Sequence, residues 1–276
     1  MSAPITGTTT ILGLIADPVI QARAPEMANR LLEDREQFGK FVLVPMRVAA
    51  VGLTDFVAGL RHLQNFTGAV VSMPHKTAMF KLVDELTPEA KLVGAVNAIR
   101  REPDGRLVGT ALDGEGFVGG LKDAGYGVAG KSCLLAGAGG AASAIAFALA
   151  KHGCSALYVI NRTHTKAAAL AARVRDAYPH VPVTTDIPTT VQFDIAINGT
   201  SLGMNDDDEL PIPLDVLSRV ALVAECVVAP EITRLLQRAQ RAELSIHTGI
   251  PMLAAQMDMM LEFMGVPHVV ARHEPD

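Results

Sequence analysis

The fold is decided by the stretch Leu134-Leu135-Ala136-Gly137-Ala138-Gly139-Gly140-Ala141-Ala142. Apolar residues typical of a strand run into a glycine-rich turn, and small residues that favour a helix follow. The wider segment Ser132–Ala150 is uncharged and long enough to cross a bilayer, which takes about 20 apolar residues. Its glycines argue against a transmembrane helix, because each costs about 0.8–1 kcal/mol relative to alanine in a helix interior. We therefore predict a buried strand, a turn and a helix.

This turn has the pattern of a dinucleotide-binding motif. The first glycine, Gly137, would permit a tight turn, and the second, Gly139, would let the backbone approach a pyrophosphate. A small residue at the third position, Ala142, would let helix and strand pack closely. The start of the helix offers unpaired N–H groups to the phosphates. We predict cofactor contacts from Gly137, Ala138, Gly139, Gly140 and Ala141; the alternative is that the turn serves close packing alone.

The residues after the next strand indicate which dinucleotide binds. That strand ends at Ile160, about 20 residues beyond the glycines, where an NAD-dependent enzyme places a carboxylate on the ribose 2′-hydroxyl. The chain instead has Asn161-Arg162-Thr163, with Lys166 one helical turn further on. A planar guanidinium suits a 2′-phosphate, so we predict NADP, bound by Asn161, Arg162, Thr163 and Lys166. The alternative is that Asn161 or Thr163 caps the helix and Arg162 is solvated.

Apolar runs of strand length alternate with amphipathic runs of helix length along most of the chain, which predicts an α/β fold. Strands are predicted at Thr9–Ile15, Phe41–Pro45, Gly68–Ser72, Ala95–Arg100, Leu107–Thr110, Cys133–Ala136, Ala156–Ile160, Val181–Thr184, Phe193–Ile197, Ala221–Ala224 and Leu244–Ile246. Helices are predicted at Pro25–Phe38, Val51–Gln64, Lys76–Leu82, Gly114–Ala124, Ala141–Lys151, Thr163–Ala177, Leu214–Val220, Ile232–Arg241 and Met252–Met264.

The composition excludes several classes of partner. The 276 residues are 49% apolar with a net charge of −5, so there is no polycationic surface for nucleic acid. The three cysteines include no CxxC pair, which argues against a disulfide framework and a zinc site. The acidic stretch Asn205–Glu209 is better explained as a solvated loop than as a metal site. Met1–Thr10 has no secretory signal pattern, so we expect a cytoplasmic protein with no membrane partner and no bound metal.

Four further motifs accompany the glycine-rich turn. Ser72-Met73-Pro74-His75-Lys76 closes a predicted strand and opens a helix, a place where α/β folds gather functional groups. Gly94–Ile99 and Gly109–Gly116 follow, and Asn198–Met204 comes after the nucleotide motif. In order and spacing these segments, with Gly249, Met252, Leu253 and Gln256, resemble the shikimate dehydrogenase family. The resemblance covers nearly the whole chain, from Gly13 to Gly265.

The resemblance implies two domains. Residues 1–112, completed by residues 248–276, would form an α/β substrate domain, and residues 113–247 would form a Rossmann-type NADP-binding domain. The C-terminal helices would pack back on the first domain. Either a monomer or a homodimer is compatible with the sequence.

The resemblance also implies roles for individual residues. Lys76 and Asp113 match the catalytic pair: Lys76 would take up the hydroxyl proton while hydride leaves the alcohol carbon for the nicotinamide, and Asp113 would hold and polarise the hydroxyl. Ser72, Asn97 and Gln256 match positions that hydrogen-bond the hydroxyls of a cyclic substrate. The positions around the nicotinamide half of the cofactor are matched by Thr200, Met204, Gly249 and Met252.

The sequence departs from the family where the substrate carboxylate would bind. The family's first loop reads His-Ser-x-Ser-Pro, whereas this chain has Gln21-Ala22-Arg23-Ala24-Pro25. Each lost serine removes a donor worth about 1.5–3 kcal/mol to a charged acceptor. Ala111-Leu112 and Val228 are also apolar where the family is polar. Either Gln21 or Arg23 supplies a replacement anchor, or the pocket accepts a less polar or uncharged cyclic alcohol.

We therefore predict an NADP-dependent oxidoreductase that interconverts a ring hydroxyl and a ketone of a shikimate-like or quinate-like cyclic hydroxy acid, with altered or weak substrate preference. A non-catalytic NADP(H)-binding regulatory or sensing protein is the alternative, because the carboxylate-binding serines are lost. A dehydrogenase of one-carbon folate chemistry would share the two-domain organisation, but Asn161–Thr163 and Gly94–Asn97 fit it poorly.

Overall fold

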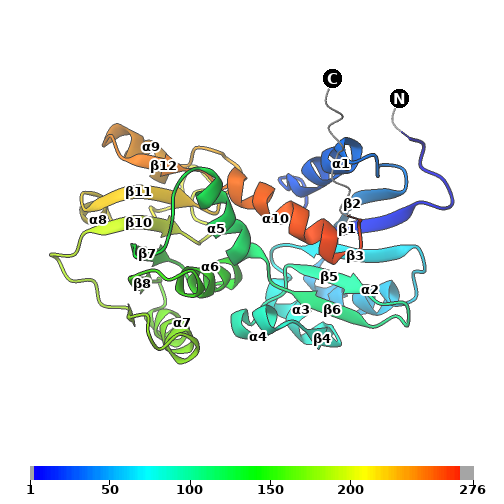
Figure 1. Ribbon diagram of the computed structural model, residues 1–276, viewed down its shortest axis with the longest axis horizontal. Coiled ribbons are helices and arrows are strands. Elements are labelled where there is room, and N and C mark those ends of the chain that lie inside the picture. The colour runs from blue at the N-terminus through cyan, green and yellow to red at the C-terminus, as the bar shows by residue number, and fades with distance from the viewer. Residues whose placement is uncertain (1–2, 268–276) are drawn as a thin grey trace, which may run out of the picture. The chain divides into compact units, whose positions relative to one another are not determined.

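The computed structural model describes residues 3–267, which divide into two compact units (Figure 1). The first unit runs to Leu112 and resumes at Met257, and the second runs from Asp113 to Gln256. The later boundary falls inside helix α10 (Ile250–Phe263). The predicted α/β class is confirmed, because each unit contains a six-stranded sheet with helices.

The sheet of the first unit gathers several strand ends at one edge. Its order is β2-β1-β3-β5-β6-β4. Strands β1, β2 and β3 are parallel, β5 is antiparallel to both of its neighbours, and β4 is parallel to β6. The carboxyl ends of β1, β2 and β3 therefore meet where β5 begins and β6 ends. The strands are β1 (Thr10–Ala16), β2 (Phe41–Arg47), β3 (Phe66–Val71), β4 (Glu85–Leu86), β5 (Ala98–Arg101) and β6 (Leu107–Thr110).

The α-helices of the first unit each bury residues, whereas the short 3₁₀ helix does not. In α1, Ala24, Ala28 and Leu32 are buried at a spacing of four residues, as an amphipathic helix requires. The helices are α1 (Ala24–Asp34), the short 3₁₀ helix η1 (Ala50–Gly52), α2 (Leu53–Leu60), α3 (Lys76–Leu82) and α4 (Pro88–Val93).

The last turns of α10 pack on the sheet of the first unit. A Cβ atom added at Gly68 of β3 would lie 2.6 Å from Cγ of Met264, so the strand and the chain just after α10 are in close contact. Arg35 forms an ion pair with Asp258, and the Arg100 guanidinium lies 5.0 Å from the centre of the Phe263 ring. The expected return of the C-terminal segment to the first domain is therefore seen for α10 from Met257 onward, whereas the part of α10 before Met257 belongs to the second unit.

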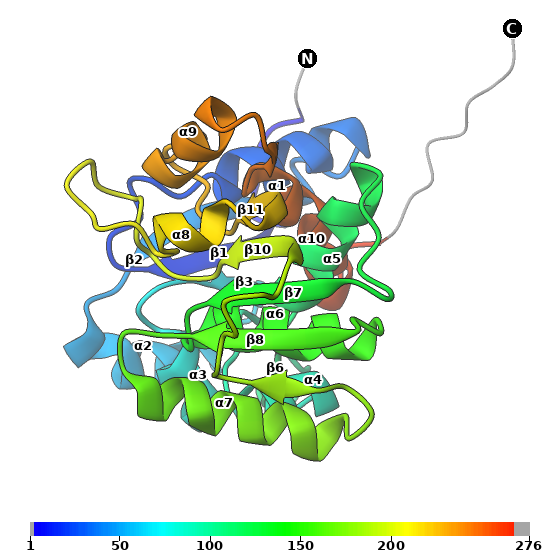
Figure 2. The same ribbon diagram turned by 90° about the vertical axis from the view of Figure 1, so that its left-hand side faces the viewer.

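The second unit is a doubly wound parallel sheet. Its order is β12-β11-β10-β7-β8-β9, and Figure 2 shows β10, β7 and β8 side by side. The chain starts in the middle with β7, so the order corresponds to 3-2-1-4-5-6 with a switch point between β7 and β10, where such folds bind ligands. The strands are β7 (Ser132–Ala136), β8 (Ala156–Ile160), β9 (Val183–Thr184), β10 (Phe193–Asn198), β11 (Val220–Glu225) and β12 (Ser245–His247).

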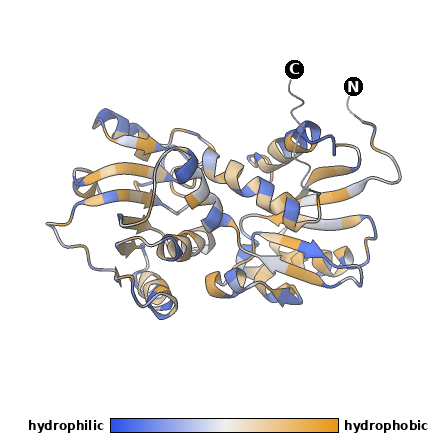
Figure 3. Ribbon diagram, in the orientation of Figure 1, coloured by the Kyte–Doolittle hydropathy of each residue, from blue (hydrophilic) through white to orange (hydrophobic). Residues whose placement is uncertain are grey.

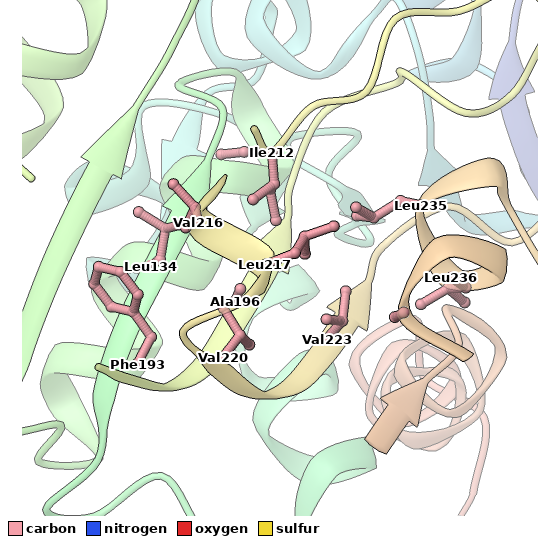
Figure 4. Close-up of a cluster of buried hydrophobic side chains, with 12 residues drawn as sticks. Leu134, Phe193, Ala196, Ile212, Val216, Leu217, Val220, Val223, Leu235 and Leu236 are labelled. Atoms are coloured by element: carbon pink, nitrogen blue, oxygen red, sulfur yellow. The ribbon is translucent and has the colours of Figure 1, made fainter. Parts of the chain in front are cut away.

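Both faces of this sheet are covered, so its strands are mostly hydrophobic (Figure 3). On one face, Leu134, Ala196 and Val223 pack against residues of α8 and α9 (Figure 4). Alternation along β7 sends Cys133 and Leu135, which are also fully buried, to the opposite face. The helices of this unit are α5 (Asp113–Asp123), α6 (Gly140–Lys151), α7 (His164–Ala177), α8 (Leu214–Leu217) and α9 (Arg234–Arg241).

The uncharged segment Ser132–Ala150 forms β7, the glycine-rich turn and most of α6, as predicted. Within the described part of the chain, no helix has the length and apolar character needed to span a bilayer. Helix α6 is buried from Ala142 to Ala150, which explains why it carries no charge before Lys151.

The prediction of local elements failed in several places. The helix expected over Leu214–Val220 ends at Leu217, because Val220 already pairs with Phe193 as the first residue of β11. Helix α4 and strand β4 were not predicted. The sequence did contain signals for both ends of α4, namely Thr87 and Gly94. The Thr87 hydroxyl accepts a hydrogen bond from the N–H of Ala90 (3.3 Å), and Gly94 ends the helix with φ of 73°.

Glycines let α5 approach its neighbours. A Cβ atom at Gly114 would collide with the backbone carbonyl of Ala144 in α6, and one at Gly120 would lie 2.7 Å from the backbone of Pro251. Backbone cannot move aside as a flexible side chain can. The glycines of α5 therefore serve close helix packing in the second unit.

We expect Gly114→Ala to lower the free energy of unfolding by about 1–3 kcal/mol, the usual cost of overpacking. Thermal unfolding followed by circular dichroism would show a fall in Tm of roughly 2–4 °C per kcal/mol for a unit of this size. Gly127→Ala is the matched control, because no heavy atom lies within 4 Å of its added Cβ. Equal melting temperatures for the two variants would contradict the packing explanation.

Candidate active site

The glycine-rich turn follows β7 at the switch point of the second sheet. Gly137 has φ of +119°, its N–H donates to the carbonyl oxygen of Ile160 at 2.7 Å, and a Cβ there would lie 3.0 Å from the Gly199 carbonyl oxygen. The left-handed backbone and the crowding both require glycine. Gly137 is therefore explained by the fold itself.

Gly139 has a different backbone and different surroundings from Gly137. It precedes α6 with φ of −85° and ψ of −171°, an extended conformation open to any residue, and an added Cβ would have no heavy atom within 4 Å. No neighbouring atom of the protein therefore requires glycine at this position. The open space lies beside the N–H groups that begin α6, at Gly140 and Ala141, where a pyrophosphate would bind. This part of the site fits a dinucleotide.

The segment after β8 presents two cations to solvent. Asn161 Nδ2 donates to the Thr163 carbonyl oxygen at 3.0 Å and so braces the turn into α7. Thr163 occupies the N-cap position, but its hydroxyl makes no capping hydrogen bond. Arg162, Thr163 and Lys166 are exposed, and within residues 3–267 neither cation forms an ion pair. The guanidinium, the ammonium and the hydroxyl fit a phosphate group.

The loop after β10 lies next to the glycine-rich turn. The N–H of Gly199 donates to the Ala136 carbonyl oxygen at 2.8 Å, which joins the ends of β10 and β7. Asn198 is fully buried, and its Oδ1 accepts hydrogen bonds from the N–H (3.0 Å) and hydroxyl (2.6 Å) of Thr200. The structure thus places Thr200 and Met204, two expected nicotinamide contacts, on a loop fixed by Asn198.

The acidic stretch after this loop also has a structural role. Asp208 Oδ2 accepts hydrogen bonds from the N–H groups of Gly203 (2.8 Å) and Asn205 (3.0 Å). These bonds lower the pKa of Asp208. Within residues 3–267, no group of three or more His, Cys, Asp or Glu side chains is arranged to hold a metal ion.

Glu225 is a buried carboxyl that was not among the predicted site residues. It ends β11 and is fully buried. Its oxygens accept hydrogen bonds from Asn198 Nδ2 (2.8 Å) and from the Thr233 hydroxyl (2.7 Å). Burial raises the pKa of Glu225 to about 7, although hydrogen bonds from Thr233, Asn198 and the Val227 backbone oppose the rise. An acidic residue at the end of an apolar strand was the one available indication.

Residues of α5 and the start of α10 come together in the second unit. A Cβ at Gly249 would collide with the Val227 carbonyl oxygen, so the chain entering α10 lies against the end of β11. At Gly116 an added Cβ would lie 2.6 Å from Cβ of Gln256 and 2.8 Å from the Met252 carbonyl oxygen. Asp113, which is 5% exposed, begins α5 one turn before Gly116.

The first unit brings Ser72, Lys76 and Asn97 together at its shared strand edge. Ser72 directly follows Val71, whose N–H donates to the Asn97 carbonyl oxygen at 2.7 Å. The N–H of Val96 donates to the Lys76 carbonyl oxygen at 3.0 Å. Asn97 is buried, and its Oδ1 accepts a hydrogen bond from the N–H of Leu112 at 2.8 Å. Two backbone hydrogen bonds therefore align the three predicted residues.

His75 stabilises the turn that carries Lys76. Its side chain is 1% exposed, and Nε2 lies 2.7 Å from the Val48 carbonyl oxygen. The backbone N–H of His75 also donates to the Ser72 carbonyl oxygen at 3.0 Å. The sequence placed His75 inside the motif without assigning it a role, because its partner after β2 is far away along the chain.

The loop after β1 is joined to the same motif but offers no serine. The N–H of Asp17 donates to the Met73 carbonyl oxygen at 3.1 Å. Arg23 Nε lies 3.5 Å from Glu26 Oε2, and the two side chains are 51% and 76% exposed. Gln21 is half-buried, and Ala24 is buried at the start of α1. Arg23 thus lies beside Glu26. That Arg23 anchors the carboxylate of a substrate stays a prediction.

Family comparisons agree with this arrangement. Residues 14–99 match the shikimate dehydrogenase substrate binding domain, and residues 121–203 match the shikimate / quinate 5-dehydrogenase family. The shikimate dehydrogenase (NADP(+)) of Geobacter metallireducens is 38% identical over 93% of this chain and 91% of its own length.

Two solved structures have the same fold over most of their length. Shikimate 5-dehydrogenase from Thermus thermophilus, in complex with NADP(H) and shikimate, is 28% identical with a TM-score of 0.81 and covers 93% of this chain and 94% of its own. The ligand-free 5-ketofructose reductase of Gluconobacter sp. is also 28% identical, with a TM-score of 0.80 and 95% of each chain covered. The resemblance predicted from the motifs is confirmed, and the chain belongs to the shikimate dehydrogenase family of oxidoreductases.

Proposed function

We propose that this protein is an NADP-dependent oxidoreductase that interconverts a ring hydroxyl and a ketone of a shikimate-like or quinate-like substrate, with little dependence on a substrate carboxylate. The observation that carries the cofactor assignment is the glycine-rich turn that leads from β7 into α6 at the switch point of the second sheet. The exposed Arg162 and Lys166 favour NADP over NAD. Similarity to the NADP(+)-dependent Geobacter enzyme supports the same assignment.

The chain supplies proton transfer and orientation for this reaction. NADP, when bound, supplies the hydride acceptor. Lys76 Nζ takes up the hydroxyl proton as the alcohol is oxidised and returns it in the reverse direction. Asp113 holds and polarises the same group, and Ser72, Asn97 and Gln256 orient the other hydroxyls of the ring. Thr200, Met204, Gly249 and Met252 contact the nicotinamide half.

The substrate preference follows from the loop after β1. Ala22 and Ala24 have no side-chain donor, and the Arg23 guanidinium faces Glu26. A carboxylate bound there would lose the hydrogen bonds that serines supply in relatives. A related fold serves 5-ketofructose reductase, whose named substrate carries hydroxyls and ketones without a carboxylate. Reduction of an uncharged polyhydroxy ketone is therefore the second candidate activity.

Lys76→Ala tests the catalytic assignment. We expect kcat for NADP reduction across a panel of cyclic hydroxy acids and polyols to fall by roughly 10²–10⁴-fold, the usual contribution of a general acid–base group. Lys81→Ala, an exposed lysine in the last turn of the same helix α3, should leave kcat unchanged. Full activity of Lys76→Ala would remove this lysine from its role. Tight NADPH binding by the wild type without turnover of any substrate would favour the regulatory alternative.

The double variant Ala22→Ser/Ala24→Ser tests the substrate assignment. Two restored donors should lower the KM for shikimate by about tenfold or more, since each hydrogen bond to a charged acceptor is worth about 1.5–3 kcal/mol. The methyl ester of shikimate, which has no charged carboxylate, is the matched control and should show little change. The assignment fails if the wild type already oxidises shikimate with a lower KM than its methyl ester.

Arg162→Gln tests the cofactor assignment. Loss of a charge-assisted contact to the 2′-phosphate should raise the KM for NADP by roughly 10–100-fold. The KM for NAD, which has no 2′-phosphate, should change less than twofold in the same variant and serves as the control. Equal changes for both cofactors would place Arg162 elsewhere in the site.

A further inference from the structure

A cluster of buried polar side chains fixes the loop after β10. We call Asn198, Thr200, Glu225 and Thr233 the Glu225 cluster. Asn198 and Glu225 end the neighbouring strands β10 and β11, and they are paired in the ladder between those strands. Asn198, Glu225 and Thr233 are each at most 1% exposed. Burying polar groups to this degree is costly unless they are hydrogen-bonded.

The hydrogen bonds of Asn198 determine the orientation of its amide. Oδ1 accepts from the backbone N–H of Thr200 (3.0 Å), which can only donate, so the oxygen must face Thr200. Nδ2 therefore faces the other way and donates to the Leu202 carbonyl oxygen (2.9 Å) and to Glu225 Oε2 (2.8 Å). Asn198 thus joins both ends of a tight turn to the carboxyl of Glu225.

Each group that is hydrogen-bonded to the Glu225 carboxyl acts as a donor. Asn198 Nδ2 donates to Oε2, and the Val227 backbone N–H donates to the same carboxyl. The Thr233 hydroxyl accepts from the N–H of Leu236 at 3.3 Å and gives its own hydrogen to Oε1 of Glu225 at 2.7 Å. A carboxylate accepts all three hydrogen bonds, whereas an amide in its place would either direct an N–H at Asn198 Nδ2 or leave the Thr233 hydroxyl hydrogen without its acceptor.

Thr233 also contacts the loop directly. Gly203, at the far end of the loop, has φ of +102°, and an added Cβ there would lie 3.2 Å from the Cβ of Thr233. The loop is therefore joined to Glu225 through Asn198 at its start and packed against Thr233 near its end.

From this geometry we propose that Glu225 is a positioning residue for the nicotinamide ring: its carboxyl fixes Asn198 and Thr233, which hold the Asn198–Met204 loop in the conformation that receives the ring. The inference rests on the proposed function, which assigns Thr200 and Met204 to the nicotinamide half of NADP. Arg162, Thr163 and Lys166, assigned to the 2′-phosphate, follow a different strand and belong to no part of the cluster.

Glu225→Gln is the main test, since it keeps the size of the side chain and changes only its hydrogen bonds. One N–H of the new amide would face Asn198 Nδ2 or the Thr233 hydroxyl. Thr233→Val removes the hydroxyl, and Thr233→Ser, which keeps it, is the rescue variant. Asp194→Asn is the matched control: Asp194 is on the same strand β10 and accepts a hydrogen bond from the N–H of Ser132 (2.8 Å), but at the opposite strand end.

The first measurement follows the loop in the protein without cofactor. Cys226 Sγ donates to the Thr200 carbonyl oxygen at 3.5 Å and is partly exposed, whereas Cys133 and Cys154 are buried and burial raises the pKa of both thiols. The rate of Cys226 modification by a thiol reagent therefore reports loosening of the loop. We expect about fivefold or faster modification in Glu225→Gln and Thr233→Val, and wild-type rates in Thr233→Ser and Asp194→Asn.

The second measurement separates the two halves of the cofactor. In Glu225→Gln we expect kcat to fall by about 10-fold or more and the fluorescence enhancement of bound NADPH to be reduced. Binding of adenosine 2′,5′-bisphosphate, which lacks the nicotinamide, should stay within twofold of wild type. Thr233→Ser should restore both properties that Thr233→Val loses.

Several results would overturn the inference. One is unchanged thiol reactivity and NADPH fluorescence in Glu225→Gln. A second is an equal loss of NADPH binding and adenosine 2′,5′-bisphosphate binding in that variant. A third is the same changes in Asp194→Asn as in Glu225→Gln. A wild type that binds no NADPH would overturn it as well. A wild type that binds NADPH but reduces no substrate would contradict the proposed function alone, because thiol reactivity and NADPH fluorescence still test the role of Glu225.

Discussion

The site depends on one constraint, the alignment of strand ends at a single edge of each sheet. In the second unit, Gly137, Gly199 and Cys226 each donate a backbone hydrogen bond to the last residue of a neighbouring strand, at 2.7–3.0 Å. These bonds fix the glycine-rich turn, the loop after β10 and the segment after β11 side by side. Because every strand of this sheet is parallel, all the connecting loops that could contact a cofactor begin at the same edge.

The first unit reaches a similar result with a mixed sheet. Strand β5 is antiparallel, so it begins at the edge where β1 and β3 end. Asn97 therefore lies beside Ser72, and the buried His75 fixes the turn between Ser72 and Lys76 through the Val48 carbonyl oxygen. A short stretch of backbone thus carries several groups suited to hydroxyl recognition, while the neighbouring loop with Ala22 and Ala24 carries none suited to a carboxylate.

Much of the fold could be predicted from the sequence because its signals are local. The apolar run before Gly137, the alanine-rich segment after it and the alternation of strands with helices depend on neighbours along the chain. Prediction was weaker where tertiary pairing decides the structure. Val220 continues a helical pattern by composition, yet it begins β11 because it pairs with Phe193 of β10. The short β4 likewise exists only through its pairing with β6.

By itself, the sequence determined the family, the glycine-rich turn, the cations after β8 and the absence of the two serines, because residue types at fixed spacings carry that information. Only the tertiary structure decided which of these glycines the fold requires: Gly137 is required by its backbone and neighbours, whereas no protein atom crowds Gly139. It also decided the hydrogen bonds of Glu225 and His75. Their partners Thr233, Asn198 and Val48 come from other elements, and a buried hydrogen bond between distant residues leaves no periodic trace in one sequence.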